Sequence, residues 1–427
     1  MRNFQALIVI SQPIRKLLTT LSLVSTLSLG SLSTAQEPVR IAFMDPLSGT
    51  FASIGNTGLK ILQFSADYYY NSRGGILGGR MIEIVPLDNK QSPNETQLQF
   101  RRAVSDDIQI IFQGNSSAVA NTLNQTISRH NRRNPGQEVL QINYSAVDPI
   151  LTEENCSFWH FRFDAHANMK LNILTDYIAA DPDIKSMYII GQDYSFGQVV
   201  SDTSIELLKQ KRPDIEIVGN EFHPIGQVKD FTPYVTKIVS SGADAVITGN
   251  FGADMVSLAR SIIDSGLDIP IYTFYAAYDG ITATLGEGGK NRIRLIHNGV
   301  ANPLPSEERK QFNHDFKAEN PNFDVTQPRI LNALQMVVTA MEQTQSTDPY
   351  DIAVALEDMR FTTIGNEEIW MRGDDHQIFQ SLSISVHTDE DIEFDADNSG
   401  WGLRTEYQVP KEDTIVESSC KMRPPRR

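Results

Sequence analysis

The sequence predicts an α/β protein made of two lobes, each built around a mainly parallel β-sheet. Its 427 residues are enough for two or three domains of ordinary size. An apolar fraction of 40% with 21% charged residues is typical of a globular protein that buries a substantial core. From Val39 onward, short β-branched runs alternate with longer amphipathic segments, which is the pattern of successive βαβ units.

The strand-like runs fall into two series separated by an aromatic segment at 158–164. Most are nearly unbroken apolar runs, as expected for strands buried on both faces. The expected strands are 39–44, 82–87, 108–112 and 139–143, and then 186–191, 215–219, 245–249, 269–275 and 293–300. The helices expected between them are 56–70, 94–105, 117–132, 168–181, 197–211, 230–240 and 253–266. Further helices at 306–319, 329–344 and 349–359 precede a two-stranded pattern at 368–387 and an irregular acidic tail.

The first 35 residues have the features of a secretory signal peptide. Arg2, Arg15 and Lys16 precede an uncharged stretch that ends in small residues before Gln36. An uncleaved anchor helix is the alternative, but the stretch is short and rich in Ser and Thr. We therefore expect export, with cleavage after Ala35.

Net charge and cysteine count narrow the possible partners. The formal net charge of −16 disfavours binding to nucleic acid or to an anionic membrane surface.

Cys156 and Cys420 are the two cysteines of the chain, and export exposes them to oxidising conditions. We expect a disulfide between them, with two isolated thiols as the alternative. A catalytic pair of Cys156 with His160 is disfavoured because a second cysteine is available.

Polar and aromatic residues follow several of the expected strands, where a parallel sheet binds its ligands. Ser116 and Ser117 open a helix and suit a carboxylate, although an ordinary N-cap is the plainer interpretation. After other strands come residues able to enclose a small ligand, each of which alone is more often core filling: Tyr144, Ser145, Tyr194, Phe196 and Phe251.

The sequence contains none of the motifs that mark common enzymes. It lacks a G-x-S-x-G elbow, a P-loop and an H-E-x-x-H zinc motif. His160 and His166 have no further metal ligand at useful spacing, and the acidic run 389–397 reads as a solvated loop. We predict no catalytic residue, no metal and no cofactor.

Several segments, taken in order, resemble one family of periplasmic receptors. They are DPLSGTFASIG (45–55), NSRGGILGGR (71–80), QGNSSAVA (113–120), QDYSFG (192–197) and DFTPYVTKIVSSGADAVITGNFG (230–252). Together they resemble the leucine/isoleucine/valine-binding proteins of ABC transporters, over most of 38–385. The resemblance implies two doubly wound lobes joined by three crossovers, near 160–164, 298–303 and 366–372. Lobe one would comprise 37–162 and 302–367, lobe two 163–301 and 368–400, and a tail 401–427.

The resemblance also implies a ligand site between the lobes. The ligand carboxylate would meet Ser116, Ser117 and the segment from Ser145 to Val147, where Val147 replaces a threonine common in amino-acid binders. An acid of the second lobe would meet the ammonium group. The matching stretch carries Tyr275, and Asp279 is its nearest carboxylate. A ligand with one anionic or amide end and an apolar or aromatic body fits this pattern.

The predicted function is therefore that of a periplasmic, monomeric substrate-binding subunit of an ABC importer. It would deliver a small amino acid or similar ligand, of the branched-chain type, to membrane permease subunits. The second hypothesis is a ligand sensor of the same fold that signals to a regulator, and the third is an exported enzyme.

Overall fold

The structure is a computed structural model that describes residues 36–277, 280–299 and 301–425. The predicted signal peptide, its cleavage site and Asp279 lie outside the described residues. In the described part of the chain, no helix combines the length and apolar character needed to cross a membrane.

The first sheet contains five parallel strands in the order β2-β1-β3-β4-β5. Strand β1, which lies between β2 and β3, carries an apolar run in which Ile41 lies opposite Ile84 and Ile110. The strands are β1 (Val39–Asp45), β2 (Ile82–Asp88), β3 (Ile110–Gln113), β4 (Leu140–Asn143) and β5 (His160–Arg162). The strand order reverses between β1 and β3, which marks a doubly wound sheet with a binding crevice at the carboxyl ends of its strands.

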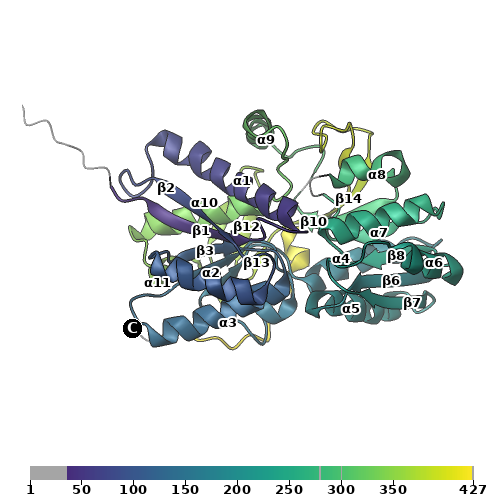
Figure 1. The fold of residues 1–427 in the computed structure, drawn as a ribbon, viewed down its shortest axis with the longest axis horizontal. Coiled ribbons are helices and arrows are strands. Elements are labelled where there is room, and N and C mark those ends of the chain that lie inside the picture. Colours follow the sequence, from purple (N-terminus) through teal and green to yellow (C-terminus); the bar gives the residue numbers. More distant parts are fainter. Residues whose placement is uncertain (1–35, 278–279, 300, 426–427) are drawn as a thin grey trace, which may run out of the picture. The chain divides into compact units, whose positions relative to one another are not determined.

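Six helices belong to this first lobe. They are α1 (Ala52–Tyr69), α2 (Pro93–Ser105), α3 (Ser117–Arg133), α9 (Glu307–Glu319), α10 (Pro328–Thr344) and α11 (Pro349–Leu356). Helix α10 is buried on most of its surface and lies beside α1, although the two are far apart in sequence (Figure 1). This helix brings residues from beyond position 300 back to the first sheet.

The second sheet repeats the same winding. Its parallel strands run in the order β7-β6-β8-β9-β10, which matches the order of the first sheet strand by strand. They are β6 (Ser186–Gln192), β7 (Glu216–His223), β8 (Ala245–Thr248), β9 (Ile271–Thr273) and β10 (Ile293–Asn298). The helices are α4 (Ala167–Ala179), α5 (Ser195–Lys211), α6 (Thr232–Ser241), α7 (Gly252–Asp264) and α8 (Ile281–Gly289). The predicted fold of two doubly wound lobes is confirmed.

The chain crosses between the lobes three times. The crossings lie between β5 and α4, between β10 and α9, and between a small antiparallel sheet and the second sheet. The small sheet comprises β11 (Arg360–Thr362), β12 (Glu368–Met371) and β13 (Ile378–Phe379). Around this crossing Ile369, Met371 and Ile378 pack in the first core, whereas Trp370 packs against the second core and Phe379 belongs to it.

The acidic tail that was expected to be irregular beyond residue 387 contains a strand. Strand β14 (Leu382–Thr388) pairs antiparallel with β10, and β15 (Gly402–Val409) pairs antiparallel with β14 at the sheet edge. In β15, Leu403 and Val409 near the two ends are buried, while the consecutive residues from Glu406 to Gln408 are exposed at the edge of the sheet.

Beyond β15 the chain returns to the first lobe. The backbone N–H of Ser419 donates to the carboxylate of Glu153 at 2.6 Å. Next to this contact, Cys156 and Cys420 form a disulfide, with their Cα atoms 5.8 Å apart. The predicted disulfide is confirmed.

Candidate functional site

A small cavity lies where the carboxyl ends of strands from the two sheets face each other. Seven of the ten predicted ligand-binding residues line it. The first lobe contributes backbone and small polar residues, and the second contributes aromatic rings. The lining residues are Gly114, Asn115, Ser116, Ser117, Ser145 and Ala146, and opposite them Tyr194, Phe196, Phe251 and Tyr275.

Three helices begin at this cavity, one from the first lobe and two from the second. Helices α3, α5 and α7 start after Ser116, Tyr194 and Phe251, and none of these residues caps its helix through a side-chain hydrogen bond. The first N–H groups of a helix have no partner within the helix, and the helix dipole favours an anion there by about 0.3–1 kcal/mol. The cavity is therefore suited to the negative end of a ligand.

The hydroxyl groups of the three serines that line the cavity differ in their hydrogen-bond partners. In the described part of the chain, no hydrogen bond involves the Ser116 hydroxyl, and the Ser116 backbone has the left-handed φ of 69°. The hydroxyl oxygen of Ser117 accepts from the backbone N–H of Asp148 at 3.2 Å. The hydroxyl oxygen of Ser145 accepts from Nη2 of Arg329 at 2.8 Å. Because an accepting hydroxyl keeps its proton, Ser117 and Ser145 remain able to donate to a ligand carboxylate.

Asp45, at the end of β1, supports the loop that carries this polar wall. Its buried carboxylate accepts from the backbone N–H of Asn115 at 2.9 Å and of Gly114 at 3.2 Å, and also from the Tyr144 hydroxyl. Burial raises the pKa of Asp45 to about 7, although these hydrogen bonds oppose the shift. Asp45 directly follows the apolar run predicted as strand 39–44, a position that could have pointed to it, but sequence analysis gave it no role.

Tyr144 and Val147 do not line the cavity. Tyr144 is fully buried, and its ring stacks on that of Phe43 at a centroid distance of 5.8 Å. At Gly114 a Cβ atom would lie only 2.6 Å from the Tyr144 ring, so the loop can pass there only as glycine. Val147 packs into the core of the second lobe. Both residues shape the site from behind.

The aromatic wall touches the first lobe directly. The Tyr275 hydroxyl donates to the backbone carbonyl oxygen of Ser145 at 3.4 Å. The ring of Phe251 lies 5.2 Å from that of Phe51, which precedes α1. These contacts hold the two lobes together around the cavity.

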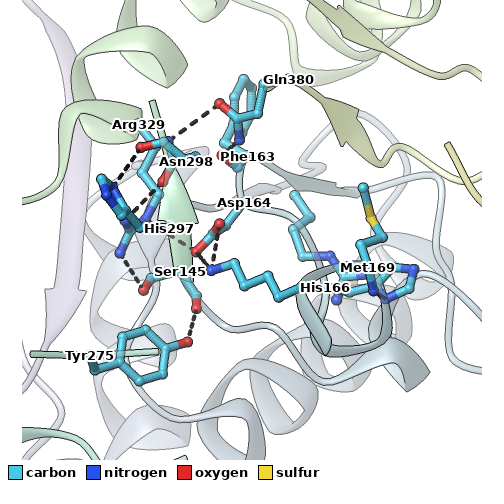
Figure 2. A network of polar contacts seen from close by, with 12 residues as sticks. Ser145, Phe163, Asp164, His166, Met169, Tyr275, His297, Asn298, Arg329 and Gln380 are labelled. Carbon is cyan, nitrogen blue, oxygen red and sulfur yellow. Dashed lines mark hydrogen bonds and ion pairs between the residues drawn. The ribbon is translucent and has the colours of Figure 1, made fainter. Parts of the chain in front are cut away.

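Behind Ser145 lies a buried polar network that sequence analysis missed (Figure 2). The carboxylate of Asp164 lies 2.9 Å from Nζ of Lys170 and 3.5 Å from Nε of Arg329. Arg329 also donates to the carbonyl oxygen of Tyr144 at 2.5 Å and to Oδ1 of Asn298 at 3.3 Å. Burial lowers the pKa of Lys170, and Asp164 opposes this shift.

This network joins the crossings between the lobes. Asp164 follows β5, Asn298 ends β10, and Gln380 stands between β13 and β14. The Nδ2 group of Asn298 donates to Oε1 of Gln380 at 3.3 Å, and Nε2 of Gln380 donates to the carbonyl oxygen of Phe163 at 3.3 Å. The polar wall of the cavity is thus linked through Arg329 to all three crossings.

The two histidines considered as metal ligands have structural partners. Nδ1 of His166 accepts from the backbone N–H of Met169 at 3.4 Å and so caps α4. Nε2 of His160 lies 3.1 Å from the amide of Asn143. Within the described ranges, no group of three or more acidic, histidine or cysteine residues is placed to hold a metal.

Comparisons with known proteins agree with this architecture. The sequence profile of the periplasmic binding protein family matches residues 38–388. Leu/Ile/Val-binding protein homolog 4 of Brucella abortus is 30% identical over 411 residues, covering 93% of this chain and 95% of that protein.

Solved structures share the fold. The leucine-, isoleucine-, valine-, threonine- and alanine-binding protein of Brucella ovis, in a closed conformation, has a TM-score of 0.79 at 27% identity, covering 91% of this chain and 100% of that one. A solute-binding protein of R. palustris in complex with benzoate has a TM-score of 0.74 at 17% identity, covering 90% and 99%. The latter likeness concerns the fold alone. The chain belongs to the periplasmic binding protein family, among relatives of the Leu/Ile/Val-binding proteins, and is a substrate-binding protein rather than an enzyme.

Proposed function

We propose that this protein is the periplasmic substrate-binding subunit of an ABC importer. It captures a small amino acid or amino-acid-like ligand of the branched-chain type between its lobes and delivers it to permease subunits. The observation that supports this is the cavity in which Ser116, Ser117 and Ser145 face the aromatic wall of the second lobe. The names of the Brucella relatives point to the same ligand class.

The chemistry of the two walls suggests how the ligand lies. Its carboxylate or amide end would meet the serines and the start of α3, and its apolar or aromatic body would lie against Phe196, Phe251 and Tyr275. No carboxylate lines the cavity in the described part of the chain. Asp254, in the first turn of α7, already accepts from Nε2 of Gln192 at 2.7 Å and from the N–H of Gly226 at 2.8 Å. Asp279 therefore remains our proposed partner for a ligand ammonium group.

The proposal includes export and a clamp made of two lobes. The precursor would be cleaved after Ala35, and the mature chain would act as a monomer in the periplasm. Lobe one would comprise 37–162 and 302–367, and lobe two 163–301 and 368–400, with 401–427 as a tail. The packing of Ile369, Met371 and Ile378 in the first core would extend lobe one by these residues. N-terminal sequencing of exported protein should give Gln36, and a sequence beginning at Met1 would exclude cleavage.

Identification of the bound molecule is the decisive experiment. Protein purified from the periplasm should release, on denaturation, a small molecule detectable by mass spectrometry, and that molecule should raise the melting temperature of stripped protein. At 100 times its dissociation constant, the expected stabilisation is about 2.7 kcal/mol. If no amino acid, amide or aromatic acid produces a shift, the proposed ligand class is wrong.

A matched pair of serine variants tests the site. Ser116→Ala removes a hydroxyl that forms no hydrogen bond with any described residue, so unliganded stability should not change, while affinity should fall by about 1–3 kcal/mol, or roughly 5- to 150-fold. Ser105→Ala, on the exposed end of α2, is the control. Equal affinity of both variants would place the ligand elsewhere.

The double variant Ser117→Ala with Phe251→Ala should abolish binding. It should also lower unliganded stability, since Ser117 bonds to Asp148 and Phe251 is buried.

Measuring ligand uptake by cells that lack the protein separates the importer from a sensor. Uptake that persists while a transcriptional response to the ligand disappears favours the sensor.

A further inference from the structure

Arg309, near the start of α9, is a buried cation with no carboxylate partner among the described residues. The Tyr69 hydroxyl lies near it but is neutral at pH 7, because burial raises the pKa of Tyr69. Arg309 is only 8% exposed, and its Nε forms no hydrogen bond with the described residues. Other buried arginines are satisfied: Arg162 donates to Oε1 of Gln377 at 2.7 Å, and Arg329 bonds as described above. An unpaired buried charge is strongly unfavourable in a folded protein. Arg309 therefore calls for a counter-ion from outside the described chain.

Arg309 lines a cavity of about 280 Å³. This cavity shares no lining residue with the small cavity between the serines and the aromatic wall, which we call the cleft. Two further polar atoms of residues in its lining lack hydrogen bonds, Oδ1 of Asn313 and Oγ1 of Thr326. The apolar part of the wall comprises Leu304, Phe316, Val325, Pro328, Phe394 and Leu403. The cavity thus combines one cation that has no carboxylate partner among the described residues and two unsatisfied polar groups with a largely apolar surface.

The acids of the cavity wall are already engaged. Asp324 is paired with Lys317 at 2.7 Å, and Glu393 with Lys310 at 3.2 Å. The carboxylate of Asp395 accepts from the backbone N–H of Gly400 at 2.9 Å. Burial lowers the pKa of Arg309 to about 10, which leaves the guanidinium protonated at neutral pH. None of these acids neutralises it.

We propose that this cavity is a second binding site, for a small organic carboxylate with an apolar body. A guanidinium binds a carboxylate through two parallel hydrogen bonds, and the apolar wall would cover the rest of the molecule. This second site does not require that the protein be an importer subunit or that a ligand occupy the first cavity. Asn298 lines this cavity and also accepts from Arg329, which bonds to Ser145 (Figure 2), so the two sites share one hydrogen-bonded network.

Phenylacetate and its neutral isostere phenylacetamide are suitable probes. Isothermal titration of the stripped, disulfide-bonded protein should show binding of phenylacetate, and binding of phenylacetamide at least tenfold weaker. The cleft variant Ser116→Ala with Phe251→Ala should retain one phenylacetate site. Arg309→Met in that background should weaken binding roughly 10- to 150-fold, while Arg309→Lys should retain part of the affinity. Arg260→Met, which removes an exposed arginine of α7, is the charge-matched control.

Three results would overturn the proposal. They are no phenylacetate binding to the parent protein, equal binding of acid and amide, and affinity unchanged by Arg309→Met. Loss of all phenylacetate binding in the cleft variant would assign the probe to the cleft instead. If Arg309→Met fails to fold, the comparison of acid with amide in the cleft variant still decides the matter. Failure of the branched-chain ligand to bind the cleft would leave these results unaffected.

Discussion

The hydroxyl of Tyr275 in the second lobe donates a hydrogen bond to the backbone carbonyl oxygen of Ser145 in the first, at 3.4 Å. From the other side, Ser145 receives a hydrogen bond from Arg329 through its own hydroxyl. One residue of the polar wall is thus held by the opposing lobe and by the network at the crossings. We infer that the contact between Tyr275 and Ser145 helps the lobes to close.

Tyr275→Phe should weaken ligand binding without unfolding the protein. The ring and its packing stay, and a single hydrogen bond between the lobes is lost, so affinity should fall by about 0.5–1.5 kcal/mol, or roughly 2- to 12-fold. Titration calorimetry with the released ligand measures this. The exposed Tyr407 provides the control Tyr407→Phe, which should bind as the parent does. An unchanged affinity in Tyr275→Phe would show that closure does not depend on this contact.

Stability should depend on pH through Asp45. Well below pH 4 its carboxyl is protonated in both the folded and the unfolded chain. Because burial raises its pKa from the usual 3.8 to about 7, the unfolded chain loses the proton first as pH rises. The stability associated with Asp45 is therefore lost between pH 4 and 7, by roughly 4 kcal/mol in total.

Asp45→Asn tests this because the amide does not titrate. Urea unfolding of the parent and the variant at pH 4, 5, 6 and 7 should give a difference that shifts in favour of the variant as pH rises. Asp202→Asn, on the exposed face of α5, should show no such trend. A constant difference between the parent and Asp45→Asn would contradict the raised pKa.

The buried network predicts an order among variants. Asp164→Asn removes the carboxylate that Lys170 and Arg329 share and should cost about 3–5 kcal/mol of unfolding free energy. Lys170→Met leaves Asp164 beside Arg329 at 3.5 Å, so it should cost less. Asp264→Asn, which breaks an exposed pair with Arg260, should cost about 0–1 kcal/mol. Denaturant unfolding measures all three, and a reversal of the first two would disprove the assignment.

Removing the disulfide should destabilise the protein. In Cys156→Ser with Cys420→Ser the unfolded chain gains the freedom of a 264-residue loop, worth at most about 5 kcal/mol on the chain-entropy account. The expected observation is a lower denaturant midpoint for the double variant than for the parent. Two free thiols titrated in denatured, unreduced parent protein would show that the bond does not form.

Sequence reasoning located the residues that stand at the ends of strands. Ser116, Tyr194 and Phe251 each follow an apolar run and precede a helix, and the winding of a parallel sheet places such positions in one crevice. Local order along the chain was enough for these residues. The same reasoning recognised both lobes because buried parallel strands leave continuous apolar runs.

It missed groups whose role depends on distant partners. Arg329 and Tyr144 are 185 positions apart, and nothing near either residue predicts their contact. Arg309 lies in a helix rich in charged residues and looks solvent-exposed until the fold buries it. Strand β15 was missed because polar residues between Leu403 and Val409 interrupt the apolar run on which strand recognition depended.

The disulfide turns most of the described chain into a covalent ring. The ring runs from Cys156 to Cys420 and contains the whole second sheet together with α9, α10 and α11. A protease that cuts once at any exposed loop within it opens the ring but releases no fragment. Nicked protein should therefore migrate as one species in a denaturing gel without reductant and as two after reduction.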